Sequence, residues 1–431
     1  MYKLQSKDFA SYLLVALATL SYIFGFYFDE NAAGGGGYKG DITLIYSNVQ
    51  LFLENDIITA TTHFDYASSR LPGIYIFHKL FNPFVDNVES YRKSIFFISF
   101  LLPILFFLCL KKNFKEASIG TLLLVSSTIF LSPYFRTSAF WGLEENLSLI
   151  FVLLSYLSVS YFLNNTKLKF TKKLICLFLV TFLSSLTFYF DSKLIIIPFL
   201  CFVKIILSNE EIKTKFVATI FYCIFSIPAL YTFVLWGGIM PVDAQESRLI
   251  GEKFFPEHVG YAMSIIAFYS LPILFFKKNI VELLKGLFLD RINLYLIFIF
   301  VLYVISLTIF FNFEEQSLLG KGIIFKLSNF FFNDLLIQQF FTYLGFIISW
   351  IIILLILDKK IINVLYLGYF IVFSFISYPI YHEYFDPLVV LMLFTYLKTS
   401  LKINQMASYV VFTYLLFVLI SADIYYYKLL N

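Results

Sequence analysis

The stretch FASYLLVALATLSYIFGFYF, residues 9–28, decides the class of this chain. It carries no charge, and it is long enough to cross the ~30 Å hydrocarbon core of a bilayer as a helix. No small-residue cleavage site follows it, so we expect a retained first membrane span and no cleaved signal peptide. Instead, acids and glycines follow at once in DENAAGGGGYKGD, residues 29–41.

The whole chain has the composition of a polytopic membrane protein. Its 431 residues are 60% hydrophobic and 14% charged, with a mean hydropathy of +0.83, whereas soluble domains carry about 25% charged residues. We count thirteen apolar runs of spanning length, of which the runs at Leu194 and Leu388 are the shortest. The runs begin near Phe9, Ser94, Ala117, Asn146, Leu174, Leu194, Phe216, Tyr261, Ile292, Leu335, Ile361, Leu388 and Met406.

These runs predict the fold class. Lipid offers the backbone no hydrogen-bond partners, so each run should form a helix. We therefore predict an all-α, polytopic protein of about 13 membrane helices. Residues 1–431 would form a single transmembrane domain, with the helices of residues 194–431 as its more variable part.

The distribution of lysine and arginine predicts the orientation. If the N-terminus is cytoplasmic, basic residues accumulate in the short loops on the cytoplasmic side. These residues are Lys111, Lys112, Lys115, Lys167, Lys169, Lys172, Lys173, Lys277, Lys278, Lys285, Arg291, Lys359 and Lys360. The long loops then lie outside, including residues 29–93, where Arg92 and Lys93 are exceptions to a rule that weakens in long loops.

The first outer loop contains two segments with helical periodicity. Apolar residues recur from Ile45 to Leu53, and again from Leu71 to Phe84, where Pro72 suits a helix start. Both segments suit interfacial helices, which together would form a lid over the outer leaflet. A hinge of four glycines would let the chain turn sharply beneath this lid. They are Gly34, Gly35, Gly36 and Gly37.

Four clusters of charged residues lie on the predicted outer face. Charges beside membrane helices are costly, so their default interpretation is functional. The clusters are Asp29, Glu30 and Asp41; His63, Asp65 and Arg70; Arg136, Glu144 and Glu145; and His382, Glu383 and Asp386. The structural alternatives are acids at helix ends, a local Asp65–Arg70 salt bridge and snorkelling at the interface. Together the clusters indicate a site that stabilises an anion and removes a proton.

Other kinds of site are not indicated. The sequence contains no GxxxxGK[ST] and no GxGxxG motif between a strand and a helix, so no cytosolic nucleotide site is predicted. We expect no nucleic-acid partner. The four cysteines lie inside apolar runs, which indicates neither a disulfide framework nor a thiolate metal site. They are Cys109, Cys176, Cys201 and Cys223.

Three segments resemble the GT-C superfamily of membrane glycosyltransferases, which use polyprenyl-phosphate or polyprenyl-diphosphate sugars. YKGDITLIYSNVQLF is similar to the Gly-Asp pair that opens the first interfacial helix of dolichyl-phosphate glucosyltransferases. FDYASSRLPGIYIFHKLF looks like their next segment, although serines and Arg70 intervene before Pro72. IYHEYFDPLVV resembles their late His-Glu segment, with Tyr384 where a lysine is usual. Protein O-mannosyltransferases and aminoarabinose transferases instead suggest the acidic pair Asp29 and Glu30.

The resemblance implies an inverting transfer of a sugar to a glycan, lipid or protein, at the outer face of a bacterial inner membrane. Asp41 would be the general base, with Asp29 and Glu30 as rivals. The residues implied to bind the donor phosphate are Arg136, Arg70 and His382. The residues implied to orient groups or bind the acceptor are Glu144, Glu145, Asp65, Glu383 and Asp386. Glu144 and Glu145 are also candidates to hold a divalent cation such as Mg²⁺ or Mn²⁺.

Three other functions remain as alternatives. An O-antigen polymerase or ligase would act on similar lipid-linked sugars, but its largest arginine-rich loops should come late in the chain. A transporter or lipid flippase should show internal repeats and charges at helix centres, where we note only Lys204. An acyltransferase is suggested only by the spacing of His382 and Asp386.

Overall fold

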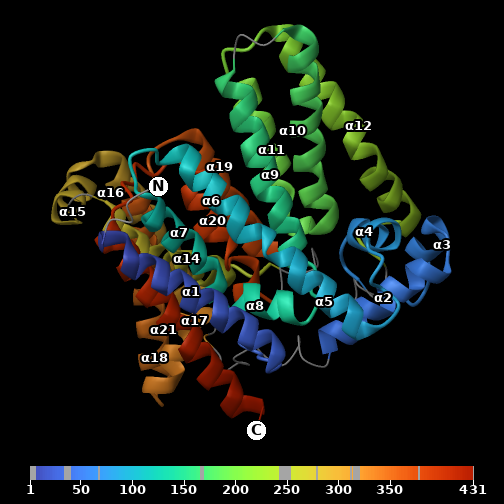
Figure 1. Ribbon diagram of the computed structural model, residues 1–431. Coiled ribbons are helices and arrows are strands. Elements are labelled where there is room, and N and C mark those ends of the chain that lie inside the picture. Colours follow the sequence, from blue (N-terminus) through green and yellow to red (C-terminus); the bar gives the residue numbers. More distant parts are fainter. Residues whose placement is uncertain are drawn as a thin grey trace. The chain divides into compact units, whose positions relative to one another are not determined.

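The computed structural model describes residues 6–33, 40–66, 68–165, 169–241, 254–277, 280–310, 313, 321–376 and 379–430. Over these residues the chain is helical, apart from turns, connecting coil and one isolated β-bridge between Lys321 and Ile380. The chain, shown in Figure 1, divides into two compact units. Unit 1 comprises Met1–Ser247 and Leu415–Asn431, and unit 2 comprises Arg248–Tyr414.

Unit 1 contains the first spans and the first loop. Its helices are α1 (Ser6–Tyr27), α2 (Ile42–Glu54), α3 (Ile57–Thr61), α4 (Gly73–Phe81), α5 (Val88–Ser99), α6 (Leu101–Asn113), α7 (Ile119–Ser127), η2 (Thr128–Leu131), α8 (Pro133–Phe140), α9 (Glu145–Asn164), α10 (Phe170–Phe190), η3 (Ser192–Ile195), α11 (Ile196–Ile206) and α12 (Ile212–Trp236). The last helix, α21 (Gln405–Leu430), begins in unit 2 and ends in unit 1.

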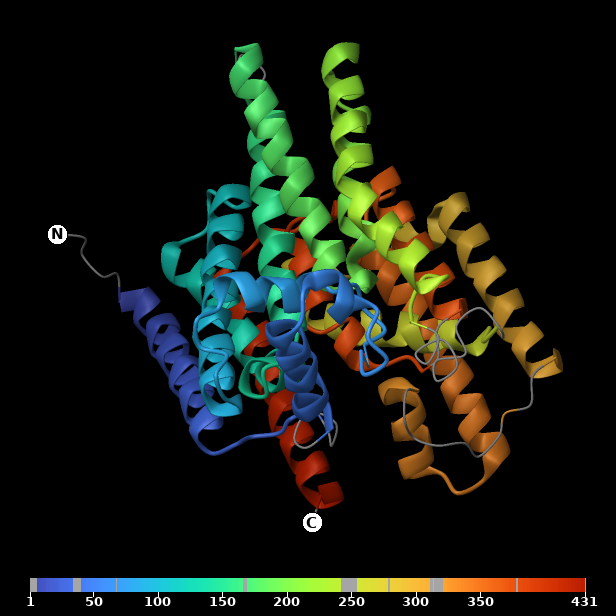
Figure 2. The ribbon, with the colours of Figure 1, turned by 90° about the vertical axis from the view of Figure 1, so that its right-hand side faces the viewer.

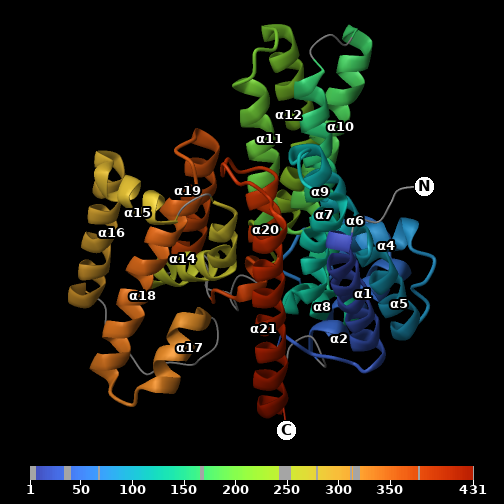
Figure 3. The ribbon, with the colours of Figure 1, turned by 60° about the vertical axis from the view of Figure 1, so that its left-hand side comes forward.

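Unit 2 is also helical, and α14, α17 and α18 pack together within it (Figure 3). Its helices are α14 (Glu257–Ser270), η4 (Leu271–Phe276), α15 (Ile280–Leu289), α16 (Arg291–Phe310), α17 (Gly322–Phe331), α18 (Leu335–Ile356), α19 (Ile361–Ile376), η5 (His382–Tyr384) and α20 (Leu388–Phe394). Isolated 3-10 segments such as η4 and η5 end or connect the longer helices.

The predicted class of fold is confirmed, but the predicted number of spans is not. Within the described residues, nine helices are long and apolar enough to cross a membrane, or ten if the bent pair of α7–η2 and α8 counts as one. The three other predicted runs form α11, α19 and α20, with 11, 16 and 7 residues. At ~1.5 Å per residue, α20 covers only about 10 Å. The length of an apolar run in sequence therefore overestimated the length of these helices. The single transmembrane domain and the greater variability of residues 194–431 stay predictions.

In unit 1, the first-loop helices and the basic residue Lys173 lie at opposite ends of α10. The first-loop helices α2, α3 and α4 gather at one end of α10 and α12 (Figure 2). The indole Nε1 of Trp236 donates a hydrogen bond to the Thr61 carbonyl at 2.9 Å, and the Phe77 and Phe190 ring centroids lie 5.7 Å apart. At the opposite end of α10, Lys173 pairs with Glu210. Both predicted lid segments are helical, whereas the predicted hinge, Gly34–Gly37, lies outside the described residues.

Unit 2 has a similar polarity. At one end, the Phe255 amide donates to the Phe375 carbonyl at 2.9 Å, near the bridge that joins Lys321 to Ile380. At the other end, Lys277 pairs with Asp358 at 3.4 Å. The loops predicted to face outward and the basic loops predicted to face the cytoplasm thus separate within the unit. Which of the two ends is cytoplasmic stays a prediction.

Helix α1 packs closely on α8 at Gly25. A Cβ atom there would lie 2.6 Å from Oε2 of Glu30 and 2.8 Å from the Phe140 ring. We expect Gly25→Ala to destabilise the protein by about 1–3 kcal/mol, because α1 must move away from its neighbours. The melting temperature of detergent-solubilised protein measures this effect. Gly368→Ala is the matched control, since nothing lies within 4 Å of its added Cβ; equal melting temperatures for the two variants would contradict the close packing.

Candidate functional site

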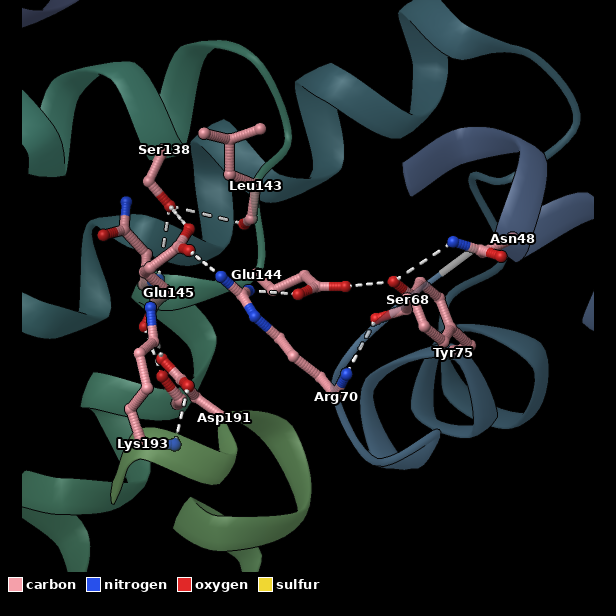
Figure 4. Close-up of polar contacts among 12 residues, drawn as sticks. Asn48, Ser68, Arg70, Tyr75, Ser138, Leu143, Glu144, Glu145, Asp191 and Lys193 are labelled. Atoms are coloured by element: carbon pink, nitrogen blue, oxygen red, sulfur yellow. Dashed lines mark hydrogen bonds and ion pairs between the residues drawn. The ribbon is translucent and has the colours of Figure 1, made fainter. Parts of the chain in front are cut away.

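Two buried ionic clusters lie in unit 1, near the first-loop helices. The Arg70 cluster comprises Asn48, Arg70, Tyr75, Ser138, Glu144, Glu145, Asp191 and Lys193 (Figure 4). The Arg136 cluster comprises Ser21, Glu30, Arg136 and Asp423. Sequence reasoning placed Arg136 with Glu144 and Glu145, but the structure assigns them to different clusters.

The tandem acids Glu144 and Glu145 begin α9. The chain turns from α8 into α9 at Gly142, which adopts a left-handed conformation with φ of +67° that favours glycine. The hydroxyl of Tyr91 donates to the Gly142 carbonyl at 2.8 Å and holds this turn. The Glu144 and Glu145 side chains are only 3% and 16% exposed. A helix N-terminus favours negative charge, which partly offsets the cost of burying two carboxylates.

Arg70 binds both acids from the segment between α3 and α4. Its Nη1 donates to Oε2 of Glu144, and its Nη2 donates to Oε1 of Glu145 at 2.6 Å. The Tyr66 hydroxyl donates to the Arg70 carbonyl at 2.8 Å and fixes the backbone. Arg70 does not form the local salt bridge with Asp65; that carboxylate is 63% exposed and lies 3.6 Å from Nδ1 of His63.

The cluster extends to α2 on one side and to η3 on the other. The Tyr75 hydroxyl donates to Oε1 of Glu144, and Nδ2 of Asn48 lies 3.5 Å from that hydroxyl. On the far side, Lys193 lies 3.6 Å from Asp191. The charge of Asp191 acts on Arg70, and the charge of Lys193 acts on Glu145. Figure 4 shows these side chains converging from the first loop, the α8–α9 turn and the α10–η3 turn.

Burial and charge act against each other in this cluster. Burial raises the pKa of Glu144, against the lowering effect of Arg70, and the charge of Glu145 adds to the rise. Burial alone would lower the pKa of Arg70, but Glu144 and Glu145 together raise it well above its ordinary value. The guanidinium therefore stays charged and holds the two acids together.

Arg136 is fully engaged in the second cluster. Nε and Nη2 bind both oxygens of Glu30, and Nη2 also donates to the Ser21 carbonyl at 2.9 Å. Nη1 donates to the Phe130 carbonyl at 3.0 Å and to the Ser21 hydroxyl at 3.4 Å. These partners use all five N–H groups of a guanidinium. A donor phosphate could bind Arg136 only by displacing them, so the geometry favours a structural role that joins α1 to α8.

The three candidate bases have different surroundings. Asp29 ends α1 with a left-handed φ of 53°, and Arg92 binds it at 2.8 Å. Glu30 is bound by Arg136. Each of these two carboxylates is thus engaged by an arginine in an ion pair.

Asp41 lies at the start of α2 in helical conformation, and it is half-buried. Residues three, four and seven positions apart share a helix face. Asp41 therefore shares the face of Ile45 and Asn48, which are 7% and 1% exposed. This face packs against the first loop and leads toward the Arg70 cluster.

Three predicted site residues, His382, Glu383 and Asp386, belong to unit 2. His382 lies in η5, with Nδ1 at 3.5 Å from the Tyr269 hydroxyl. Burial, and to a smaller extent the positive charge of Lys326, lower the pKa of His382 to about 3. The imidazole is therefore neutral at physiological pH, so it would meet a phosphate as an uncharged hydrogen-bond donor. Glu383 is half-buried and Asp386 is buried; a meeting of His382 with Arg136 stays a prediction.

An apolar groove lies beside His382 in unit 2. It has a volume of about 460 Å³ and runs between α14, α17 and α18. Phe268 lines the groove, and its ring centroid lies 6.4 Å from that of His382. A hydrocarbon chain fits such a surface better than a polar ligand does.

The structure does not bring together the predicted metal ligands in a form that suits a cation. Glu144 and Glu145 both face Arg70, whose guanidinium occupies the space between them. In the part of the chain that is described, no group of three or more His, Cys, Asp or Glu side chains suits a metal ion. The divalent cation stays a prediction that would require Arg70 to move.

Several residues of the two clusters were missed in the sequence. Asn48 and Tyr75 looked like ordinary residues of amphipathic helices, and their roles depend on partners far along the chain. Asp423 had a detectable signal, because it is an acid inside an apolar span. It lies in α21, within electrostatic range of Glu30 and Arg136.

No protein-family model, curated protein or solved structure matches this chain. The apolar helices define a multi-pass α-helical membrane protein whose environment is a lipid bilayer.

Proposed function

We propose that this protein is an inverting, GT-C-type glycosyltransferase that moves a sugar from a polyprenyl-phosphate or polyprenyl-diphosphate donor at the outer membrane face. The observation that carries the proposal is the position of Asp41. It lies on the inward face of a first-loop helix that is linked to a buried Arg-Glu cluster at the start of α9. Acceptors of this chemistry are hydroxyl groups of glycans, lipids or proteins.

In the proposed reaction, Asp41 accepts the proton of the acceptor hydroxyl. The acceptor oxygen attacks the anomeric carbon, and the bond from that carbon to the donor phosphate breaks with inversion. The electron pair stays with the leaving phosphate. A positioned base of this kind contributes about 10²–10⁴-fold to the rate.

The apolar groove in unit 2 supports a lipid-linked donor. Its lining is almost entirely hydrocarbon and aromatic, and one lining residue, Phe268, lies beside the half-buried His382. The neutral imidazole can donate one N–H to a phosphate oxygen without the cost of a buried charge. The groove therefore has the kind of lining that a polyprenyl chain would need.

The proposal is tested with purified protein in vesicles that contain a panel of polyprenyl-phosphate and polyprenyl-diphosphate sugars. Mass spectrometry follows the sugar product and the released lipid phosphate. We expect the protein to consume one donor of the panel and to form a product whose anomeric configuration is opposite to that of the donor. Growth of a diphosphate-linked polymer with release of the diphosphate would instead support an O-antigen polymerase, and movement of an intact lipid-linked sugar across the vesicle would support a transporter. Either result contradicts the proposal.

Asp29→Asn separates the rival bases. Asparagine tolerates the left-handed backbone at this position. The substitution removes the ion pair with Arg92, which contributes about 0–1 kcal/mol because the Asp29 carboxylate is exposed to solvent. We expect transfer within about twofold of wild type and little change in melting temperature. A loss of activity as large as that of Asp41→Asn, with normal folding, would make Asp29 the base.

A further inference from the structure

The position of α2 is set by α4 along most of its length. The Nζ atom of Lys79 on α4 donates to the carbonyls of Phe52 and Asn55 at 2.6 Å, and so holds the C-terminal end of α2. The Phe52 and Tyr75 ring centroids lie 5.6 Å apart. Near the start of α2, the Tyr46 hydroxyl donates to the Val85 carbonyl at 2.9 Å.

Helix α4 is in turn fixed to the N-terminus of α9. Arg70 lies in the segment that immediately precedes α4, and it binds Glu144 and Glu145. Gly73, the first residue of α4, lies so close to α10 that an added Cβ would lie 2.6 Å from the Tyr189 carbonyl. Because these contacts act at several points and are largely shielded from water, α4 has little freedom to shift against α9 and α10.

Tyr75 joins these two sets of contacts. Its side chain is 1% exposed, and its hydroxyl lies between Glu144 of α9 and Asn48 of α2. Asn48 is two helical turns from Asp41 on the same face, about 10 Å along the axis. A change at Tyr75 therefore reaches Asp41 through a single rigid helix.

We propose that Tyr75 is a positioning residue for Asp41: its hydroxyl ties Glu144 to Asn48 and thereby fixes the face of α2 that carries the base. This inference rests on the proposed transfer reaction for its kinetic consequence, but not for its structural one. Small displacements of a reacting group reduce rates strongly, by about 10²-fold for 1 Å.

The kinetic test uses Tyr75→Phe in the full chain, which removes the hydroxyl and keeps the ring against Phe52. We expect kcat to fall about 10- to 100-fold, while KM for the donor changes less than about twofold. Tyr156→Phe is the matched control, because Tyr156 is also buried in unit 1 and its hydroxyl donates one hydrogen bond to Oδ1 of Asn113, about three turns along α9 from Glu145. Asn48→Ala should give a fall like that of Tyr75→Phe, and the double variant should fall no further. Full addition of the two effects, or wild-type kcat in Tyr75→Phe, would overturn the proposal.

The structural test needs no activity. With the four native cysteines replaced, spin labels at Asp41→Cys and at exposed Phe199→Cys report the distance from α2 to α11 by double electron–electron resonance. We expect Tyr75→Phe to broaden or shift this distribution and Tyr156→Phe to leave it unchanged. An unchanged distribution in Tyr75→Phe refutes the positioning role even if transfer is confirmed. A shifted distribution in a protein without transfer activity refutes only the proposed function.

Discussion

Asp41→Asn should abolish sugar transfer and leave a folded, membrane-inserted protein. Asparagine has nearly the shape of aspartate, but it cannot accept the proton of an attacking hydroxyl, so the rate should fall by about 10²–10⁴-fold. Asp41 is half-buried at the first turn of α2, and asparagine fills the same space there. Initial rates with the identified donor, together with the melting temperature, measure the effect.

Asp86→Asn is the matched control for this variant. Asp86 is an exposed acid in the same loop, and the substitution is chemically identical. It should keep wild-type rates. Transfer by Asp41→Asn at the rate of the Asp86→Asn control would discard Asp41 as the base and shift attention to Asp29 or Glu30.

Arg70→Met should cause the largest loss of stability among substitutions in the first loop. Methionine fills similar space, but it leaves the buried carboxylates of Glu144 and Glu145 without their shared cation. Breaking one side of a buried ion pair costs about 3–5 kcal/mol. Thermal unfolding of the detergent-solubilised protein, with the yield of folded protein, measures the loss.

A second substitution distinguishes the lost ion pair from a general packing defect. Glu144→Gln in the Arg70→Met chain removes one uncompensated charge, so it should restore part of the stability. Lys93→Met is the control, because Lys93 and its partner Glu89 are 53% and 55% exposed and such pairs are worth about 1 kcal/mol or less. Equal losses in Arg70→Met and Lys93→Met, or no recovery in the double variant, would show that the cluster does not hold the loop.

The membrane helices and the lid were predictable because local patterns determine them. The uncharged run at residues 9–28 forms α1, and the apolar spacing of Ile45, Val49 and Phe52 forms the buried face of α2. The apolar run that begins at Leu388 predicts a membrane span, but its helix ends at Phe394. A hydropathy pattern shows which residues avoid water, and not where the helix ends.

The ionic partners could not be predicted, because they lie far apart in sequence. Arg70 and Glu144 are 74 positions apart, and Arg136 and Glu30 are 106 apart. Proximity in sequence suggested instead that Arg136 joins Glu144. The turn at Gly142 separates them, and α1 brings Glu30 to Arg136. The recurrence of acids and arginines on one face was informative, but their pairing depends on how α1, α4, α8 and α9 pack.

The neutral state of His382 shows the same limit. A histidine beside two acids in sequence favours a cation, but Tyr269 and Phe268 surround the imidazole in the fold. Burial in the fold, and not the residues adjacent in sequence, determines the charge of the imidazole. A phosphate at this position would meet a neutral hydrogen-bond donor.

The most direct test of the central claim is a cryo-electron microscopy structure with a non-hydrolysable polyprenyl-phosphate sugar analogue. We predict that the anomeric carbon lies close enough to Asp41 for one acceptor hydroxyl to fit between them, with Arg70 still bound to Glu144 and Glu145. An analogue bound far from Asp41, or an Asp41 that faces the cytoplasmic side, would contradict the account.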